Sequence, residues 1–137
     1  MDETQIRTQR VRELNELRDE ITQLSGHLNA ANYRFLRLIG EFDRRQGWVD
    51  NVTQSCAHWL NWKCGIALGA AREKVRVARA LESLPIIAAA MERGEISYSK
   101  VREITRVACA NTGIFQWTAT VLKLLEQYRH RSHILRL

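Results

Sequence analysis

Residues that interrupt helices are scarce in this sequence. Proline occurs once among 137 residues, at Pro85, and glycine occurs seven times. A chain with so few interruptions, with 45% hydrophobic residues and no low-complexity segment, is typical of a folded and mostly helical protein. We therefore expect an all-α fold in one domain over residues 1–137, large enough to enclose a core.

Other absences exclude further classes of protein. No uncharged apolar run is long enough to cross a bilayer, so we expect no membrane association. The charged start Met1-Asp2-Glu3 does not match a secretory signal peptide, and three cysteines are an odd number for a disulfide framework. We expect a cytoplasmic protein with reduced thiols.

No pattern for catalysis or for a bound cofactor is present. The sequence has no glycine-rich phosphate loop and no nucleophile elbow. Cys56, His58 and Cys64 do not have the spacing of a zinc knuckle, and no second pair follows them. His130 and His133 are one helical turn apart but are better explained as cations at a helix C-terminus. We predict no catalytic residue, metal, cofactor or small-molecule site.

A heptad repeat of apolar residues marks the N-terminal third of the chain. It predicts one helix over residues 1–47, with Gly26 and Asn29 weakening its middle and Gly47 serving as its C-terminal cap. The repeat positions are also the candidate residues of a dimer seam: Leu14, Leu17, Ile21, Leu24, Leu28, Phe35, Leu38 and Phe42.

Two arrangements can bury this repeat. Four heptads permit a coiled coil between two copies of the chain, and thus a homodimer. Alternatively the repeat packs on the chain's own later helices, which we favour because a domain of this size needs its longest apolar face covered. Arg7 and Arg10 occupy positions of the same repeat, so we expect the first two turns to fray.

A short helix is predicted over Cys56–Cys64, capped by Thr53 or Ser55 and ended by Gly65. Three tryptophans lie in or just before this helix. Such a cluster could stack bases, but at helical spacing we expect it to belong to the core. The tryptophans are Trp48, Trp59 and Trp62.

Three more helices are predicted between residues 70 and 108. Pro85 suits the first turn of the middle one, Gly94 ends that helix, and Ser97 caps the next. A final amphipathic helix is expected within residues 109–137, which gives four or five short helices beside the long one. The inward-facing residues of the first and third of the three helices are Ala71, Val75, Ala78, Leu81, Val101, Ile104 and Ala108.

The net charge of +6 lies entirely in the second half, since residues 1–69 hold equal numbers of acidic and basic side chains. A basic surface could bind phosphate groups without reading sequence. It could equally be a solvated surface partly neutralised by Glu73, Glu82 and Glu103. The candidate contacts to a DNA backbone are Arg72, Lys74, Arg76, Arg79, Lys100, Arg102 and Arg106.

The segment from Trp48 to Ala108 resembles the bacterial family called domain of unknown function 222. Its motifs cover residues 53–108, whereas residues 109–137 depart from the family pattern. The matching pieces are Ser55 to Leu60, Ala71-Arg72, Val75 to Leu81, Leu84-Pro85, and Gly94 to Ser97 followed by Val101-Arg102.

The resemblance implies a helical region that precedes an HNH nuclease motif, which would lie beyond residue 137. From it we expect a non-catalytic, DNA-associated helical module that binds nucleic acid non-specifically. The alternatives are a protein-interaction or dimerisation module built on the repeat between Leu14 and Phe42, and a non-functional, shortened copy of a longer gene.

Overall fold

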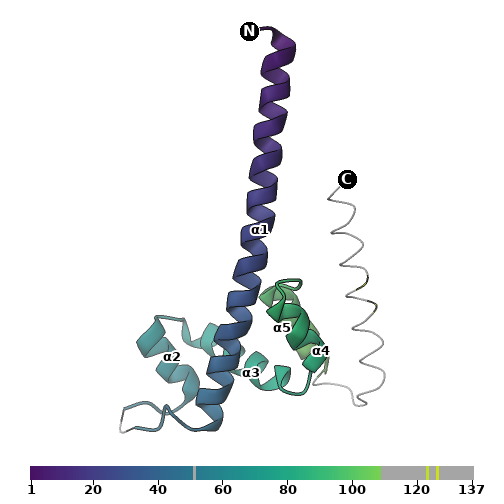
Figure 1. The fold of residues 1–137 in the computed structure, drawn as a ribbon. Coiled ribbons are helices and arrows are strands. Elements are labelled where there is room, and N and C mark those ends of the chain that lie inside the picture. Colours follow the sequence, from purple (N-terminus) through teal and green to yellow (C-terminus); the bar gives the residue numbers. More distant parts are fainter. Residues whose placement is uncertain (51, 109–122, 124–125, 127–137) are drawn as a thin grey trace.

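The computed structural model of the chain describes residues 1–50, 52–108, 123 and 126. The described part is all-α, with one long helix packed against shorter ones, which confirms the predicted fold class (Figure 1). The C-terminal helix predicted within residues 109–137 lies outside the described residues. No helix in the described part is long and apolar enough to cross a membrane. The helices are α1 (Glu3–Arg44), α2 (Cys56–Cys64), α3 (Leu68–Leu81), α4 (Pro85–Glu92) and α5 (Tyr98–Ala108).

Helix α1 is much longer than the body formed by the other helices. Its 42 residues correspond to about 63 Å at the standard rise, and every residue from Met1 to Ser25 is exposed. Figure 1 shows the N-terminal half running away from α2–α5, which gather around the C-terminal half. The helix begins at Glu3, where the backbone amide of Asp2 donates to the side chain of Gln5 at 3.2 Å. The first two turns, which we expected to fray, are helical in the structure.

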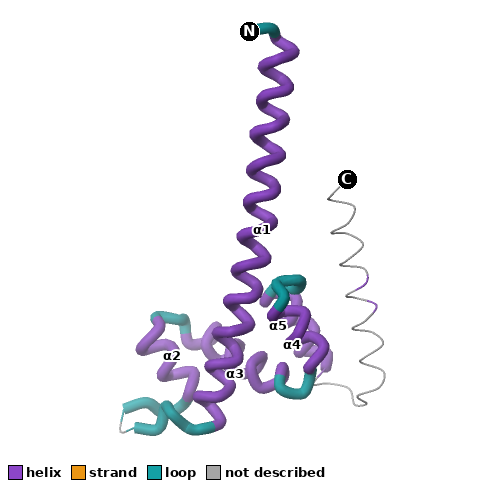
Figure 2. Tube along the Cα trace, viewed as in Figure 1, coloured by secondary structure: helices purple, strands orange, loops and turns teal. Residues whose placement is uncertain are grey.

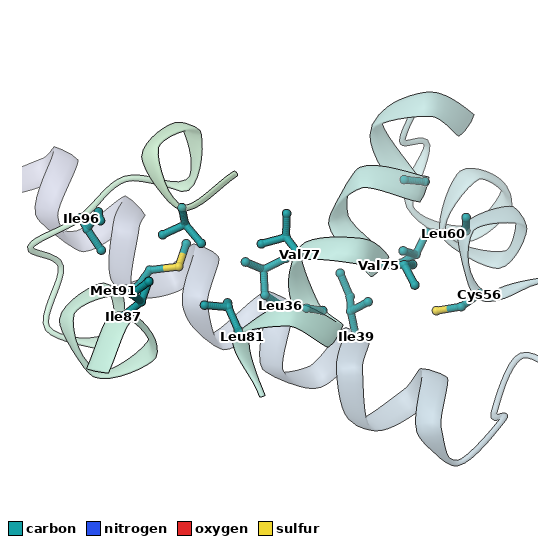
Figure 3. Packing of buried hydrophobic residues seen from close by; sticks show 14 of the residues in the cluster. Leu36, Ile39, Cys56, Leu60, Val75, Val77, Leu81, Ile87, Met91 and Ile96 are labelled. Carbon is teal, nitrogen blue, oxygen red and sulfur yellow. The ribbon is translucent and has the colours of Figure 1, made fainter. Parts of the chain in front are cut away.

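The core extends along α3, which contacts each of the other four helices. Figure 3 shows Cys56 and Leu60 of α2 at one end, Leu36 and Val77 in the middle, and Met91 of α4 near the other end. The inward-facing residues predicted for α3 are all buried. Val77 is also buried, because α3 is covered on more than one side.

The predicted boundaries of the short helices are confirmed. Ser55, rather than Thr53, caps α2, since its hydroxyl accepts the amide of His58 at 3.1 Å. Gly94 ends α4 in the left-handed region with φ +80°, and the hydroxyl of Ser97 accepts the amide of Lys100 at 3.3 Å.

The end of α1 differs from the prediction. Gln46, with φ +51°, is the residue in the left-handed conformation, and Gly47 is not the cap. Gly47 instead provides space, because a Cβ atom there would overlap the ring of Phe42. The glycine was correctly associated with the helix end, but its role is close packing.

The middle of α1 contacts the loop between α4 and α5 through backbone atoms (Figure 2). A Cβ atom on Gly94 would overlap the carbonyl oxygen of Gly26, and the side-chain amide of Asn29 donates to the carbonyl oxygen of Gly94 at 3.3 Å. Gly26 and Asn29, which the sequence marked as weak positions of the helix, thus fix where α1 leaves the body.

The tryptophan cluster is divided by the fold. Trp48 and Trp59 pack against the core, and the ring of Trp59 lies 4.5 Å from that of Phe42 between centroids. Trp62 is 55% exposed, with the ammonium group of Lys63 4.1 Å above its ring, so the expectation of a core position is wrong for this residue.

Candidate functional site

Glu73 on α3 is the centre of a cluster of arginines. The guanidinium group of Arg76 donates to it at 2.8 Å and that of Arg102, on α5, at 3.1 Å. The guanidinium group of Arg106 lies 3.8 Å from the same carboxylate. Three cations thus face one anion. We call Glu73, Arg76, Arg102 and Arg106 the arginine cluster.

Arg76 also joins α3 to α5 through hydrogen bonds. Its guanidinium group donates to the hydroxyl of Thr105 at 3.3 Å and to the carbonyl oxygen of Arg102 at 3.4 Å. Thr105 is fully buried. Arg76 therefore holds α5 against α3 and is less available to an external phosphate than its charge alone indicates.

Hydrogen bonds from Arg76, reinforced by Arg102, hold the pKa of Glu73 at about 2. The carboxylate is therefore ionised throughout the physiological range. Among the described residues the arginine cluster holds three positive charges and one negative charge, so Arg102 and Arg106 can attract an anion to its outer face.

The other candidate contacts are dispersed. Lys74 lies with its ammonium group 4.1 Å above the ring of Tyr98, and burial lowers its pKa. Lys100 lies 3.4 Å from Glu103 on its own helix. Arg72 is exposed on α3. The seven predicted contacts therefore do not form one continuous set of available cations.

Arg79 is directed towards the end of α1. Its guanidinium group makes two hydrogen bonds with the carboxylate of Asp43, at 2.7 and 3.0 Å. Arg72 and Arg79 line a shallow depression of about 580 Å³ next to the first turn of α2. Asp43 was not identified from the sequence, because it lies 36 residues away and only the fold brings the two together.

The predicted dimer seam is split into two parts by the fold. Phe35 and Phe42 pack against the core, as the intramolecular interpretation required. The preceding part is not covered by α2–α5, and its side chains are 46–67% exposed, so within the described helices the intramolecular interpretation applies only to Phe35 and Phe42. Leu38 is also half exposed. We call the exposed part the projecting stripe, which consists of Leu14, Leu17, Ile21, Leu24 and Leu28.

Two apolar residues of α1 were overlooked in the sequence. Ile6 and Val11 are 48% and 52% exposed and lie N-terminal to the projecting stripe. They do not occupy positions of the heptad repeat, which is why the pattern did not select them. Their spacing of five residues places them on opposite flanks of the seam.

Within the described residues, no three His, Cys, Asp or Glu side chains are placed to hold a metal ion. Cys56 is buried, and burial raises the pKa of its thiol to about 11. Cys64 is exposed. The imidazole of His58 accepts the amide of Gln54 at 3.3 Å, which gives it a local structural role. His130 and His133 lie outside the described residues.

Replacing Glu73 by glutamine should lower the free energy of unfolding by about 1 kcal/mol, because half-exposed ion pairs to arginines are lost. A carboxylate whose pKa is depressed in the folded state stabilises it above the unfolded pKa and loses this effect as pH falls. The difference between wild type and Glu73→Gln should therefore shrink from about pH 4.5 down to about pH 2.

Urea unfolding at neutral and acid pH measures this difference. The matched control is Glu103→Gln, whose exposed pair with Lys100 should contribute less than about 0.5 kcal/mol. Equal effects of the two substitutions at neutral pH would contradict the central place of Glu73.

The model of a family described as Domain of unknown function (DUF222) matches residues 15–118. No curated protein and no solved structure matches the chain. The match begins within α1 and includes all of α2–α5.

Proposed function

The chain belongs to the domain of unknown function 222 family, and we propose that it is a non-catalytic helical module that associates with a second copy of itself through the projecting stripe. The observation that carries this proposal is the exposure of the stripe. Five large apolar side chains at heptad spacing stay about half exposed on a segment that none of α2–α5 covers.

A helix whose apolar face is not covered lacks the packing that usually stabilises helices. Most helices in water depend on packing of an apolar face rather than on propensity. Exposed apolar surface that is contiguous and regularly spaced is uncommon on monomers and typically marks an interaction site. A second helix with the same repeat would cover the stripe of its partner while its own stripe is covered.

Sedimentation velocity of the full chain over a wide range of concentrations tests this proposal. We expect a concentration-dependent shift from monomer to dimer. A chain that stays monomeric at the highest concentration would contradict it.

A second candidate function is non-specific binding of a polyanion. It is supported by the excess positive charge of the arginine cluster and by the exposed Arg72. Duplex DNA is the polyanion to test first, because the family resemblance implies that such regions stand beside an HNH nuclease unit. Contacts of this kind bind phosphates and release counterions.

Fluorescence anisotropy with a labelled duplex at several salt concentrations tests the second candidate. We expect weak binding, with no strand cleavage in the presence of magnesium. Arg72→Ala with Arg106→Ala should reduce the salt dependence by about 0.9 per lost phosphate contact. Arg12→Ala with Arg34→Ala removes the same charge from exposed positions of α1 and is the control. Equal losses in both variants would contradict a specific surface on α3 and α5.

A further inference from the structure

We propose that the two copies pair in parallel and in register along the projecting half of α1, from Val11 to Leu28. This inference rests on the self-association proposed above and adds the orientation of the partner. The argument depends on the residues that flank the projecting stripe, because the apolar residues of the stripe fit either orientation.

The spacing of the stripe assigns a heptad register. Leu14, Ile21 and Leu28 occupy the a positions, whereas Leu17 and Leu24 occupy the d positions. Leucine at d with isoleucine at the central a position is a combination found in two-stranded parallel coiled coils. The flanking g positions are then residues 6, 13 and 20, and the flanking e positions are residues 11, 18 and 25.

In a parallel pair, each g residue faces the e residue five positions later in the other helix. Glu13 then faces Arg18 of the second copy, an attractive pair that occurs twice by symmetry. Within the monomer Glu13 and Arg18 contact only neutral side chains of α1, Gln9 at 3.0 Å and Asn15 at 3.1 Å, in the hydrogen bonds that the structure describes.

Antiparallel pairing of the exposed segment gives the opposite result. The alignment that keeps the paired layers away from Phe35 places Leu14 opposite Leu24 and Leu17 opposite Ile21 of the second copy. It then puts Arg18 opposite Arg18 and Glu20 opposite Glu20, and both pairs repel. An alignment shifted by one heptad would pair Leu17 with Leu28 and would avoid this repulsion. It would also run Arg10 of the second copy over Phe35, which already packs against the body.

The N-terminal limit of the paired segment follows from the same register. Arg7 and Arg10 occupy a and d positions, where two copies in parallel would bring like charges together. The apolar layers therefore start after Arg10. Because each body is attached to the C-terminal half of α1, parallel pairing places both bodies at the same end of the assembly (Figure 1).

A charge exchange tests the orientation. Glu13→Arg alone and Arg18→Glu alone should each weaken self-association by roughly tenfold, because each converts two attractive pairs into two repulsive ones. An equimolar mixture of the two variants should recover wild-type affinity, since both cross pairs are again attractive. Sedimentation velocity with one variant fluorescently labelled measures the mixed species.

The opposite pattern would overturn the proposal. In an antiparallel pair, Arg18→Glu mixed with wild type would associate more tightly than wild type alone. A wild type that forms dimers without this rescue would reject the parallel orientation but keep the self-association. A wild type that forms no dimer would reject both.

Disulfide trapping provides a second measurement. In a background with Cys64→Ser and Cys109→Ser, Leu24→Cys should form an intermolecular disulfide on mild oxidation, because equivalent d positions meet in a parallel pair. Cross-linking instead only between Leu14→Cys and Leu24→Cys chains would establish the antiparallel arrangement. The parent background without the new cysteine is the control for cross-linking elsewhere.

Discussion

Leu17→Asp combined with Leu24→Asp is expected to make the chain monomeric while leaving its body folded. A dimer contains four of these leucines, and each loses roughly 1 kcal/mol of burial when replaced, given that about half of its surface is exposed in the monomer. Four carboxylates would also be enclosed without partners. The dissociation constant should therefore rise about a thousandfold or more.

The body provides an independent readout for this variant. Trp48 and Trp59 pack against the core, so their near-ultraviolet circular dichroism should not change. Far-ultraviolet ellipticity should decrease moderately, because a projecting helix without a partner frays. Replacing Phe35 instead would confuse the result, since Phe35 packs against the core and its loss would destabilise the monomer.

Thr22→Asp combined with Gln23→Asp is the matched control. Both residues are exposed, lie on the opposite side of α1 from the stripe and add the same negative charge. This control should keep the dimer with little change in affinity. If the Leu17 and Leu24 variant still forms dimers, the stripe is not the interface. If its body unfolds cooperatively, the stripe is covered within the molecule.

Local signals in the sequence were sufficient to define the body. The apolar spacing along α3, the proline at the start of α4 and the glycines after α2 and α4 depend only on near neighbours in the chain. Each acts through backbone geometry or through a single helical face. The same signals therefore gave the correct helix boundaries without knowledge of the tertiary structure.

The division of the heptad repeat could not be predicted in this way. The spacing from Leu14 to Phe42 is uniform, and it does not show that the body covers Phe35 and Phe42 but not Leu24. Coverage depends on where α2–α5 dock. That position depends in turn on the contact of Gly26 with Gly94, which are 68 residues apart in the sequence. A residue pattern alone does not reveal a pairing over such a distance.

The candidate basic surface also depends on contacts between distant residues that the sequence pattern does not reveal. The sequence identified cations on α3 and α5 and named Glu73 as a neutralising residue, and the structure places Arg76, Arg102 and Arg106 around it. The sequence did not reveal that Arg79 pairs with Asp43. A cation of α3 therefore serves to attach α1, and the surface available to a polyanion is smaller than the charge pattern indicated.

Gly94→Ala is expected to destabilise the body by about 2 to 5 kcal/mol. Part of this cost is conformational, because alanine is strained at the φ of +80° that Gly94 adopts. The rest is steric, since the new methyl group would overlap the carbonyl oxygen of Gly26 and force α1 away from the loop between α4 and α5. Thermal and urea unfolding measure the loss.

Replacing Gly26, on the other side of this contact, tests whether only Gly94 has to be glycine. A Cβ atom on Gly26 meets only the carbonyl oxygen of Gly94, at an ordinary van der Waals distance of 3.8 Å. Gly26 also lies inside a helix, where alanine is favoured over glycine by about 1 kcal/mol. Gly26→Ala should therefore leave stability unchanged or raise it slightly, whereas Gly94→Ala lowers it strongly. Equal losses at both positions would mean that the two backbones approach each other differently, and the place where α1 leaves the body would then not be set by this contact.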